Sequence, residues 1–237
     1  MAEQGLLVDL DGTLYRGDGA VLAYGDHLAA TLPPPDGTWF RSALATYLTH
    51  GAAASGMPSA TDGWEAVQQL AGKFGIAKAA VDEAFLASRR ALADPDCPIE
   101  TPDGLLPALR RLRPTTRLVL ATNSPADWLA PLLTRLDAAG VFDEIVTGAG
   151  KPAGLPAILA ALAGRIGATD RPWRVFSVGD HWHNDIAPAR AFGATTGYID
   201  RFGRNDGPAD VVAPDLEGVL PTMLRWAAAP DEFADRV

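Results

Sequence analysis

The chain has 237 residues, enough for one large domain or for one domain with a smaller insert. Its 29 acidic and 20 basic residues give a net charge of −9, which argues against nucleic acids and anionic membranes as main partners. A single cysteine, Cys97, excludes an internal disulfide and a cysteine-based metal cluster. Because the chain shows neither a basic-then-apolar leader nor an apolar run of about 20 residues, we expect a soluble cytoplasmic protein.

The first predicted element is a strand that ends in acidic residues. The apolar run 6–8 leads into Asp9, and Asp11 and Gly12 follow. A turn at Gly12 would bring Asp11 back beside Asp9 at the carboxyl edge of a sheet, where open α/β sheets bind ligands. Two close carboxylates repel each other unless a cation binds between them or one takes a proton. This stretch is therefore a candidate site for metal or proton chemistry.

The next segment is predicted to be helical. Turn-forming residues at 15–19 predict a tight hairpin, and the glycine- and alanine-rich stretch 51–60 predicts a loop. Four helices are predicted. The first spans residues 20–32, and the second begins at Asp36 or Thr38 and runs to about residue 48. The third begins after a capping box formed by Asp62 and Glu65, and the fourth spans residues 81–92. Residues 20–95 therefore form an all-helical insert, which leaves the sheet at the edge that carries Asp9.

From residue 101 onward, helices alternate with short apolar strands. The predicted helices span residues 103–112, 125–138, 152–166, 183–192 and 215–228, and the predicted strands span residues 116–121, 142–147, 174–178, 195–199 and 210–212. Repeated αβ units of this kind predict a doubly wound, mostly parallel, Rossmann-like sheet. We expect a core domain from residues 1–19 and 96–237, with residues 20–95 inserted as a second domain.

Three further polar segments follow predicted strands. They are Thr122-Asn123-Ser124, Lys151, and the loop that carries Asp180 and Asp185. An open parallel sheet would bring these strand ends to one edge. The edge would then hold four carboxylates, one lysine and one hydroxyl. The carboxylates suit Mg²⁺, which prefers oxygen ligands and keeps several waters that a substrate phosphate can share or replace.

Simpler interpretations exist for some of these residues. Asp185 could merely cap the helix that follows, and Lys151 could be a surface lysine. His181 and His183 are two histidines without a nearby third ligand, which is weak support for a zinc site. The segment 148–151 resembles a phosphate-binding P-loop only superficially, because Ile145 and Pro152 stand where that motif needs glycine and serine or threonine.

Together these motifs resemble the haloacid dehalogenase superfamily. The set Asp-x-Asp-Gly-Thr at 9–13, Thr122-Asn123, Gly-Lys-Pro at 150–152 and Gly-Asp-x-x-x-x-Asp at 179–185 occurs in the order of that superfamily, and the helical insert resembles its cap domain. The resemblance implies that Asp9 is a nucleophile and Asp11 a general acid and base. It also implies Mg²⁺ on the Asp9 carboxylate, the Asp11 backbone carbonyl and Asp180, with Asp185 as a further ligand or as a support through water. The phosphoryl group would be held by Thr122 and Lys151, with Leu10 and Asn123 as substrate contacts.

The sequence thus predicts a Mg²⁺-dependent phosphatase of small phosphorylated metabolites that forms an aspartyl-phosphate. A phosphomutase would keep every residue named above. A dehalogenase of the superfamily is disfavoured, because such enzymes lack an acid at the position of Asp11. A non-catalytic binding protein would be expected to have lost Asp9 or the metal carboxylates. The predicted partner is a small molecule, and the protein is expected to be a monomer or a homodimer.

Overall fold

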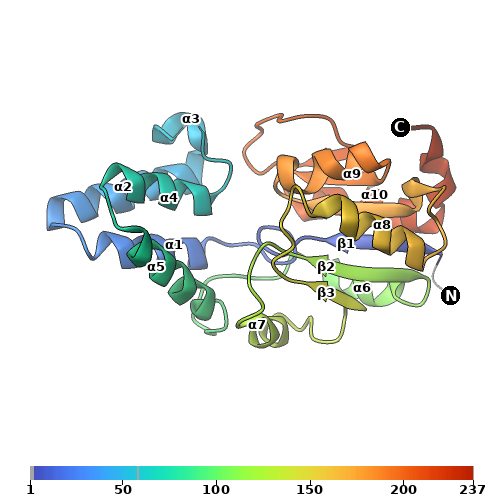
Figure 1. Ribbon diagram of the computed structural model, residues 1–237, viewed down its shortest axis with the longest axis horizontal. Helices are drawn as coiled ribbons and strands as arrows, with labels where there is room; N and C mark the ends of the chain where they lie inside the picture. The colour runs from blue at the N-terminus through green and yellow to red at the C-terminus, as the bar shows by residue number, and fades with distance from the viewer. Residues whose placement is uncertain (1–2, 58, 237) are drawn as a thin grey trace. The chain divides into compact units, whose positions relative to one another are not determined.

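The structure, a computed structural model, describes residues 3–57 and 59–236. The chain divides into two compact units (Figure 1). The segments that end at Arg16 and begin at Glu100 form the first unit, here called the core unit. Gly17–Ile99 form the second, here called the helical unit, where we expected an insert over residues 20–95. Each unit is described by itself below.

The core unit contains a six-stranded sheet whose strand pairings are all parallel, which confirms the predicted α/β fold class. The strand order is β3-β2-β1-β4-β5-β6. The strands are β1 Gln4–Val8, β2 Thr116–Ala121, β3 Glu144–Val146, β4 Val175–Gly179, β5 Thr195–Ile199 and β6 Val211–Ala213. β2 and β3 lie on one side of β1, and β4, β5 and β6 lie on its other side. The strand order therefore reverses its direction at β1, and open α/β sheets bind ligands at such a switch point.

The register around β1 determines which residues meet at the carboxyl edge. Val8, the last residue of β1, is aligned with Leu120 in β2 and with Val178 in β4. The next residue, Asp9, continues the pairing, because its N–H donates to the carbonyl of Val178 at 3.0 Å. The loops that follow β1, β2 and β4 therefore begin side by side.

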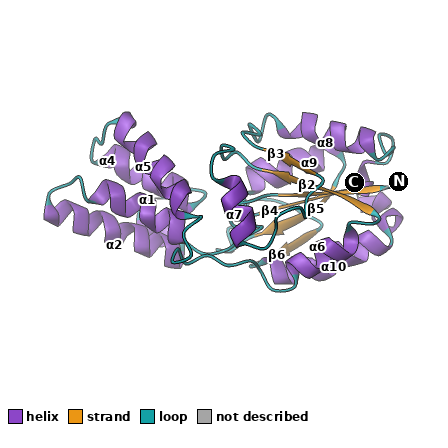
Figure 2. Cartoon of the chain, turned by 90° about the horizontal axis from the view of Figure 1, so that it is seen from below, coloured by secondary structure: helices purple, strands orange, loops and turns teal. Residues whose placement is uncertain are grey.

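Helices cover both faces of the sheet (Figure 2). On one face lie α8 and α9, and on the other lie α6 and α10 (Figure 2). Neighbouring positions of the sheet enter different layers. Leu7 of β1 belongs to the apolar cluster with α8. Phe176 of β4, which is aligned with Leu6 of β1, packs on Trp226 of α10 with ring centroids 5.3 Å apart. The helices of this unit are α6 Leu105–Leu112, α7 Leu129–Arg135, α8 Leu155–Arg165, α9 Ala187–Phe192 and α10 Leu216–Ala228.

The helix predicted over residues 183–192 begins differently. A π-helical turn, Trp182–Ile186, precedes α9, and the Ala187 N–H donates to the carbonyl of Trp182, five residues earlier. Pro188 has no N–H with which to continue an α-helical hydrogen-bond pattern through this turn. The wider turn places Asp185 inside the protein.

The helical unit is built from α1 Gly19–Ala29, α2 Pro34–His50, α3 Ala52–Ser55, α4 Gly63–Lys73 and α5 Lys78–Ala91. The predicted cap of α4 is confirmed, because the side chain of Asp62 accepts a hydrogen bond from the Glu65 N–H at 2.7 Å. The predicted loop 51–60 is wrong in part, because it contains the short helix α3; Pro58, in the same range, lies outside the described residues.

The predicted hairpin at 15–19 is wrong. Arg16 instead pairs with Glu100, where the chain re-enters the core unit, through backbone hydrogen bonds of 2.8 and 2.9 Å. The two side chains form an ion pair at 2.8 Å, and Arg16 also contacts Glu217 of α10 at 2.5 Å. The partner of Arg16 is thus 84 residues distant, beyond the reach of any local turn motif.

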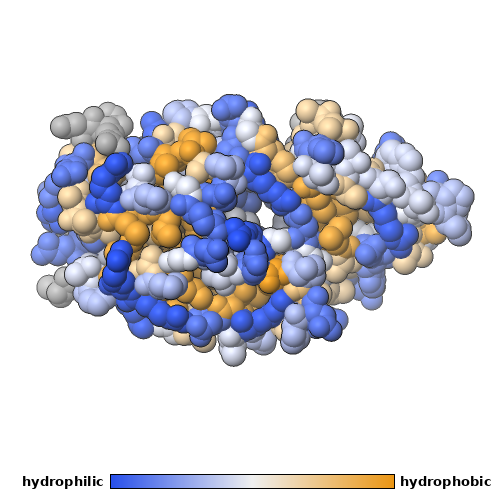
Figure 3. Space-filling view, turned by 180° about the vertical axis from the view of Figure 1, so that it is seen from behind, coloured by the Kyte–Doolittle hydropathy of each residue, from blue (hydrophilic) through white to orange (hydrophobic). Residues whose placement is uncertain are grey.

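Hydrophilic and hydrophobic residues are interspersed on the face shown in Figure 3. Among the described residues, the exposed large hydrophobic side chains are Leu22, Trp39, Leu86, Ile145 and Val212. In the part of the chain that the structure describes, none of the helices combines the length and the apolar character needed to cross a bilayer.

Candidate active site

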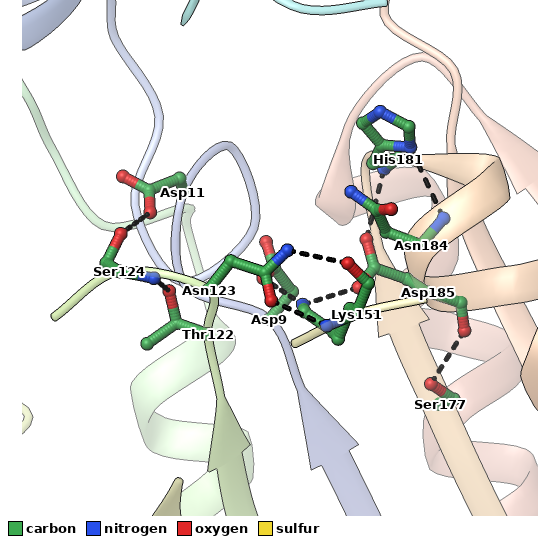
Figure 4. Close-up of polar contacts among 10 residues, drawn as sticks. All are labelled: Asp9, Asp11, Thr122, Asn123, Ser124, Lys151, Ser177, His181, Asn184 and Asp185. Carbon is green, nitrogen blue, oxygen red and sulfur yellow. Dashed lines mark hydrogen bonds and ion pairs between the residues drawn. The ribbon is translucent and has the colours of Figure 1, made fainter. Parts of the chain in front are cut away.

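Asp9 lies at the centre of the carboxyl edge, immediately after β1. The residue is only 8% exposed, and its Oδ1 accepts a hydrogen bond from the Lys151 Nζ at 2.6 Å (Figure 4). Burial raises the pKa of Asp9 to about 7, since the charged form loses water, and the nearby charges of Asp185 and Asp11 act in the same direction. The attraction of Lys151 opposes this increase.

Lys151 lies beyond β3 and bridges two carboxylates. Its Nζ is 2.6 Å from an oxygen of Asp9 and 2.6 Å from an oxygen of Asp185. Burial lowers the pKa of Lys151, but the two facing carboxylates raise it more, so that the net shift is upward and the ammonium stays charged. Burial, together with the nearby charges of Asp185 and Asp11, therefore keeps the pKa of Asp9 high despite its short ion pair with Lys151.

Asp185 is fixed from three directions. Its Oδ1 faces Lys151, its Oδ2 accepts from the His181 N–H at 3.2 Å, and its backbone carbonyl accepts from the Ser177 hydroxyl at 3.1 Å. A side chain at Gly179 would overlap the carboxyl group of Asp185, so glycine is required there for the close approach. Asp185 is thus a preorganised buried anion.

Asp180 completes a group of three acids. Asp9, Asp180 and Asp185 each offer a carboxylate oxygen, and these oxygens lie within 4.8 Å of one another. The oxygens around a Mg²⁺ ion are about 3 Å apart at neighbouring positions and about 4 Å apart at opposite ones, given metal–oxygen distances of about 2.1 Å. The spacing and the all-oxygen donor set fit a hard divalent cation after a small contraction of the group.

Gly12 makes room for Asp180. It has a φ of +81°, and a Cβ at this position would overlap the Asp180 carboxylate. The glycine that follows the two aspartates in the sequence thus has two functions: it permits the turn, and it lets an acid from the loop after β4 approach that turn.

Asp11 is directed away from these three acids. Its two oxygens accept hydrogen bonds from the hydroxyl of Tyr15 and, at 2.9 Å, from that of Ser124. In Figure 4 the Asp11 carboxyl group lies on the opposite side of Asp9 from Lys151 and Asp185. Its side chain is not one of the three that form the acidic group, which is compatible with the expectation that only its backbone would meet a metal.

Thr122 and Asn123 follow β2. Thr122 is buried, and its Oγ1 accepts from the Ser124 N–H at 3.0 Å. The Asn123 amide holds the backbone of Lys151 from both sides: its Oδ1 accepts from the Lys151 N–H at 2.7 Å, and its Nδ2 donates to the Lys151 carbonyl at 3.0 Å. The predicted substrate contact Asn123 is thereby engaged in fixing the lysine.

The remaining predicted residues have more limited roles in the geometry. The side chain of Leu10 is buried, and the Leu10 carbonyl accepts a hydrogen bond from the Leu14 N–H at 3.0 Å. A contact between Leu10 and a substrate would therefore be made by the backbone N–H of Leu10. The Nδ1 of His181 accepts from the Asn184 N–H at 3.3 Å. Neither His181 nor His183 belongs to the acidic group.

Three hydroxyl-bearing residues around the aspartates are not predicted from the sequence: Tyr15, Ser124 and Ser177. Ser124 stood in a segment already noted for its hydroxyl and amide groups, so its proximity to Thr122 was an available signal. Tyr15 fell in the stretch expected to form a hairpin, and Ser177 is one residue in an apolar strand. Nothing local marks either hydroxyl as a partner of an aspartate.

The arrangement combines a buried carboxylate, a fixed ammonium, two further acids suited to a cation and a separate carboxyl group held by hydroxyls. Such a site can attack an electrophile with Asp9 and can stabilise negative charge that develops nearby. The Leu10 N–H, just after β1, adds a further donor for an anion.

Comparison with solved structures shows the same fold in several proteins. A predicted phosphoglycolate phosphatase from Haemophilus somnus 129pt aligns with a TM-score of 0.65 and 18% identity over 93% of this chain and 97% of its own. A 2-haloacid dehalogenase from Pseudomonas syringae pv. Tomato DC3000 aligns with a TM-score of 0.55 and 20% identity over 95% and 100%. The putative hydrolase YfnB from Bacillus subtilis, bound to magnesium, aligns with a TM-score of 0.63 and 16% identity over 95% and 100%.

No curated protein matches the chain in sequence. The model of one protein family matches residues 4–193, a range that includes every site residue described above. The chain belongs to the haloacid dehalogenase-like hydrolases.

Proposed function

We propose that this hydrolase is a Mg²⁺-dependent phosphatase that acts on small phosphorylated metabolites through an aspartyl-phosphate on Asp9. The proposal depends on the presence of a second carboxyl group. The proposed nucleophile, Asp9, is buried against Lys151, and Asp11 follows it by two residues. Phosphate-ester cleavage needs an acid for the leaving oxygen, whereas displacement of a halide does not. The named neighbours include both a phosphatase and a dehalogenase, so the fold alone does not choose between them.

In the first step, an Asp9 oxygen attacks phosphorus and the bond to the ester oxygen breaks. Asp11 transfers its carboxyl proton to that oxygen, which leaves as an alcohol. In the second step, Asp11, now a carboxylate, takes a proton from water as the water oxygen attacks phosphorus. The bond between Asp9 and phosphorus breaks, and inorganic phosphate is released with both side chains restored.

The other residues position the phosphoryl group and stabilise its charge. The Lys151 ammonium keeps Asp9 in place and offers positive charge to the phosphoryl oxygens, and Thr122 and the N–H groups after β1 and β2 supply hydrogen-bond donors. The cation would be held by Asp9, Asp180, Asp185 and the backbone carbonyl of Asp11. Bound there, Mg²⁺ would supply Lewis-acid stabilisation of the phosphoryl oxygens.

The test is hydrolysis of p-nitrophenyl phosphate by the wild type and by Asp9→Asn, each with Mg²⁺ and with EDTA. We expect turnover that requires Mg²⁺ and that falls at least about 10³-fold in the variant, because the covalent step is lost. Incubation with 2-chloropropionate in parallel would detect a dehalogenase. Equal phosphatase rates for the wild type and Asp9→Asn, or release of chloride without phosphatase activity, would overturn the proposal.

We further propose that the helical unit selects the substrate. It is inserted directly after the loop that carries Asp11, so binding by residues of this unit could be coupled to the catalytic loop through the chain itself. A screen of phosphorylated metabolites, repeated with a variant altered only within Gly17–Ile99, tests this assignment. Substrate preference should change while Mg²⁺ dependence is retained.

A further inference from the structure

The hydroxyl groups around Asp11 occupy both oxygens of its carboxyl group. One oxygen meets the Tyr15 hydroxyl, and the other meets the Ser124 hydroxyl at 2.9 Å. The two donors come from different parts of the core unit, Tyr15 from the loop after β1 and Ser124 from the loop after β2. A carboxyl group held at both oxygens has a defined direction as well as a defined position.

The two donors are themselves anchored. The Ser124 N–H donates to Thr122 Oγ1 at 3.0 Å, and the Tyr15 N–H donates to the Leu10 carbonyl at 3.3 Å. Tyr15 and Ser124 are 3% and 8% exposed. Rotation of either hydroxyl-bearing side chain away from Asp11 would therefore disturb a packed environment, so the direction of the carboxyl group is built into the two loops.

We propose that Tyr15 and Ser124 are positioning residues that direct the Asp11 carboxyl group toward the ester oxygen of the substrate. This inference rests on the proposed phosphatase function. Both hydroxyls donate to the carboxyl group of Asp11. Their effect should therefore be confined to the proton-transfer part of the reaction, with attack by Asp9 left intact.

The effect on proton transfer by Asp11 can be distinguished from an effect on attack by Asp9 if the leaving group is varied. A nitrophenolate leaves readily without a proton, whereas a phenolate without electron-withdrawing groups needs one in the transition state. Misdirecting Asp11 should slow the poorer leaving group much more than the better one. A general acid contributes about 10²- to 10⁴-fold, so a misdirected one should lose about 10-fold or more on the poor leaving group.

The experiment compares kcat/KM for p-nitrophenyl, phenyl and p-methoxyphenyl phosphates, which differ little in size. Ser124→Ala and Tyr15→Phe should lose at least about 10-fold on the two poorer leaving groups and less than about threefold on p-nitrophenyl phosphate. Ser124→Thr, which keeps the hydroxyl, should restore most of the loss. In an Asp11→Asn background, Ser124→Ala should have no further effect on the ratio between substrates, because it acts through Asp11.

Two control variants remove hydroxyls elsewhere. Thr195→Ala removes a buried hydroxyl that donates to the Trp173 carbonyl in the core unit, and Thr134→Ala removes one that donates to the Ala130 carbonyl in α7. We expect both controls to keep the wild-type ratio between substrates. A loss of stability alone would lower the rates on all three substrates together.

The outcomes separate the two proposals. A wild type that hydrolyses none of the three esters overturns the proposed function and this inference with it. An active wild type overturns only this inference if Ser124→Ala and Tyr15→Phe leave the ratio unchanged or reduce all three rates equally. This inference alone is also overturned if Ser124→Ala still changes the ratio of kcat/KM between substrates in the Asp11→Asn background. A wild type that is itself far slower on the poorer leaving groups overturns it as well.

Discussion

Asp9, Asp185 and Lys151 form a buried group with one more negative than positive charge. Such a group is costly to desolvate, and the raised pKa of Asp9 expresses that cost. The site is therefore in an unfavourable charge state near neutral pH unless a proton or a cation is added. Under the proposed function, the burial of Asp9 in its charged form is an example of stability given up for function.

This imbalance predicts a pH-dependent effect of Asp9→Asn on stability. The pKa of Asp9 is raised by burial from 3.8 to about 7, so its contribution to stability is fully present below pH 3.8 and is lost as the pH rises through 7. Asparagine has no charge to bury. In EDTA, the melting temperature of Asp9→Asn relative to the wild type should be higher at pH 8 than at pH 5.

Two controls define that measurement. Asp170→Asn changes a carboxylate that is 88% exposed, and we expect no comparable pH-dependent gain from it. Added Mg²⁺ should reduce the difference at pH 8, because binding stabilises the wild type in preference to the variant. A difference between Asp9→Asn and the wild type that is constant from pH 5 to pH 8 would contradict the interpretation.

Asp180 and Asp185 should respond differently to the same substitution. Asp185→Asn removes an anion that pairs with Lys151 and accepts from His181, so it should destabilise the protein by about 1–3 kcal/mol. Asp180→Asn removes one of three mutually repelling acids, so thermal stability should be unchanged or higher.

The same two variants test the metal site. Calorimetric titration should show weaker Mg²⁺ binding in both variants. An unchanged affinity for Mg²⁺ in Asp180→Asn would show that Asp180 is not a metal ligand.

At the scale of single elements, the glycines at the carboxyl edge limit what the loops tolerate. Gly12→Ala places a Cβ against Asp180 at a φ of +81°, and Gly179→Ala places one against Asp185. Each should destabilise the protein by about 1–3 kcal/mol and lower phosphatase activity, since the acidic group must shift.

The matched control is Gly164→Ala in α8, where an added Cβ meets no atom within 4 Å. That substitution should stabilise the core unit by about 0.5–1 kcal/mol with activity unchanged, because alanine is favoured over glycine in a helix. Chemical denaturation and p-nitrophenyl phosphate hydrolysis measure both effects. Equal loss of activity in all three variants would show that the close approach of the acids is unimportant.

The strands of the core unit were predictable because their apolar runs are short and are bounded by turns. The predicted strands 116–121 and 195–199 have the same bounds as β2 and β5. The helix predicted over 183–192 was wrong in its first turn, because the π-helical geometry depends on Pro188 and on the burial of Asp185. Periodicity reports which residues face the core but not which hydrogen-bond pattern a single turn adopts.

The site was predictable only in part for a related reason. The proximity of Asp9, Asp180 and Lys151 follows from parallel strands that end at one edge, which the alternation of helices and strands indicates. The direction of the Asp11 side chain depends on two hydroxyls from separate loops, and Arg16 pairs with a residue 84 positions away. Such contacts depend on tertiary packing, and the spacing of residues in a single sequence does not predict them.

At the scale of the whole molecule, the two units differ in how their contacts are distributed along the chain. The helical unit is one continuous segment, Gly17–Ile99, whereas the core unit joins residues before and after it. Local contacts form faster than contacts that close long loops. During refolding, backbone amides of α1 and α2 should therefore gain protection before those of β1.

Pulse-labelling hydrogen exchange during refolding from urea measures this order directly. The amides of β1 should become protected together with those of β2 and β4, since β1 pairs with both. Protection of β1 before the helical unit would contradict the expected sequence of events. A full-length chain is used, so no assumption is made that either unit folds alone.

The central position of β1 also bears on biosynthesis. β1 is translated before both of its neighbours in the sheet, of which one begins at Thr116 and the other at Val175. Asp9 therefore stays in contact with water until the segments that carry Lys151 and Asp185 have been translated. The raised pKa of its carboxyl group is a property of the assembled sheet edge, because burial there is its main cause.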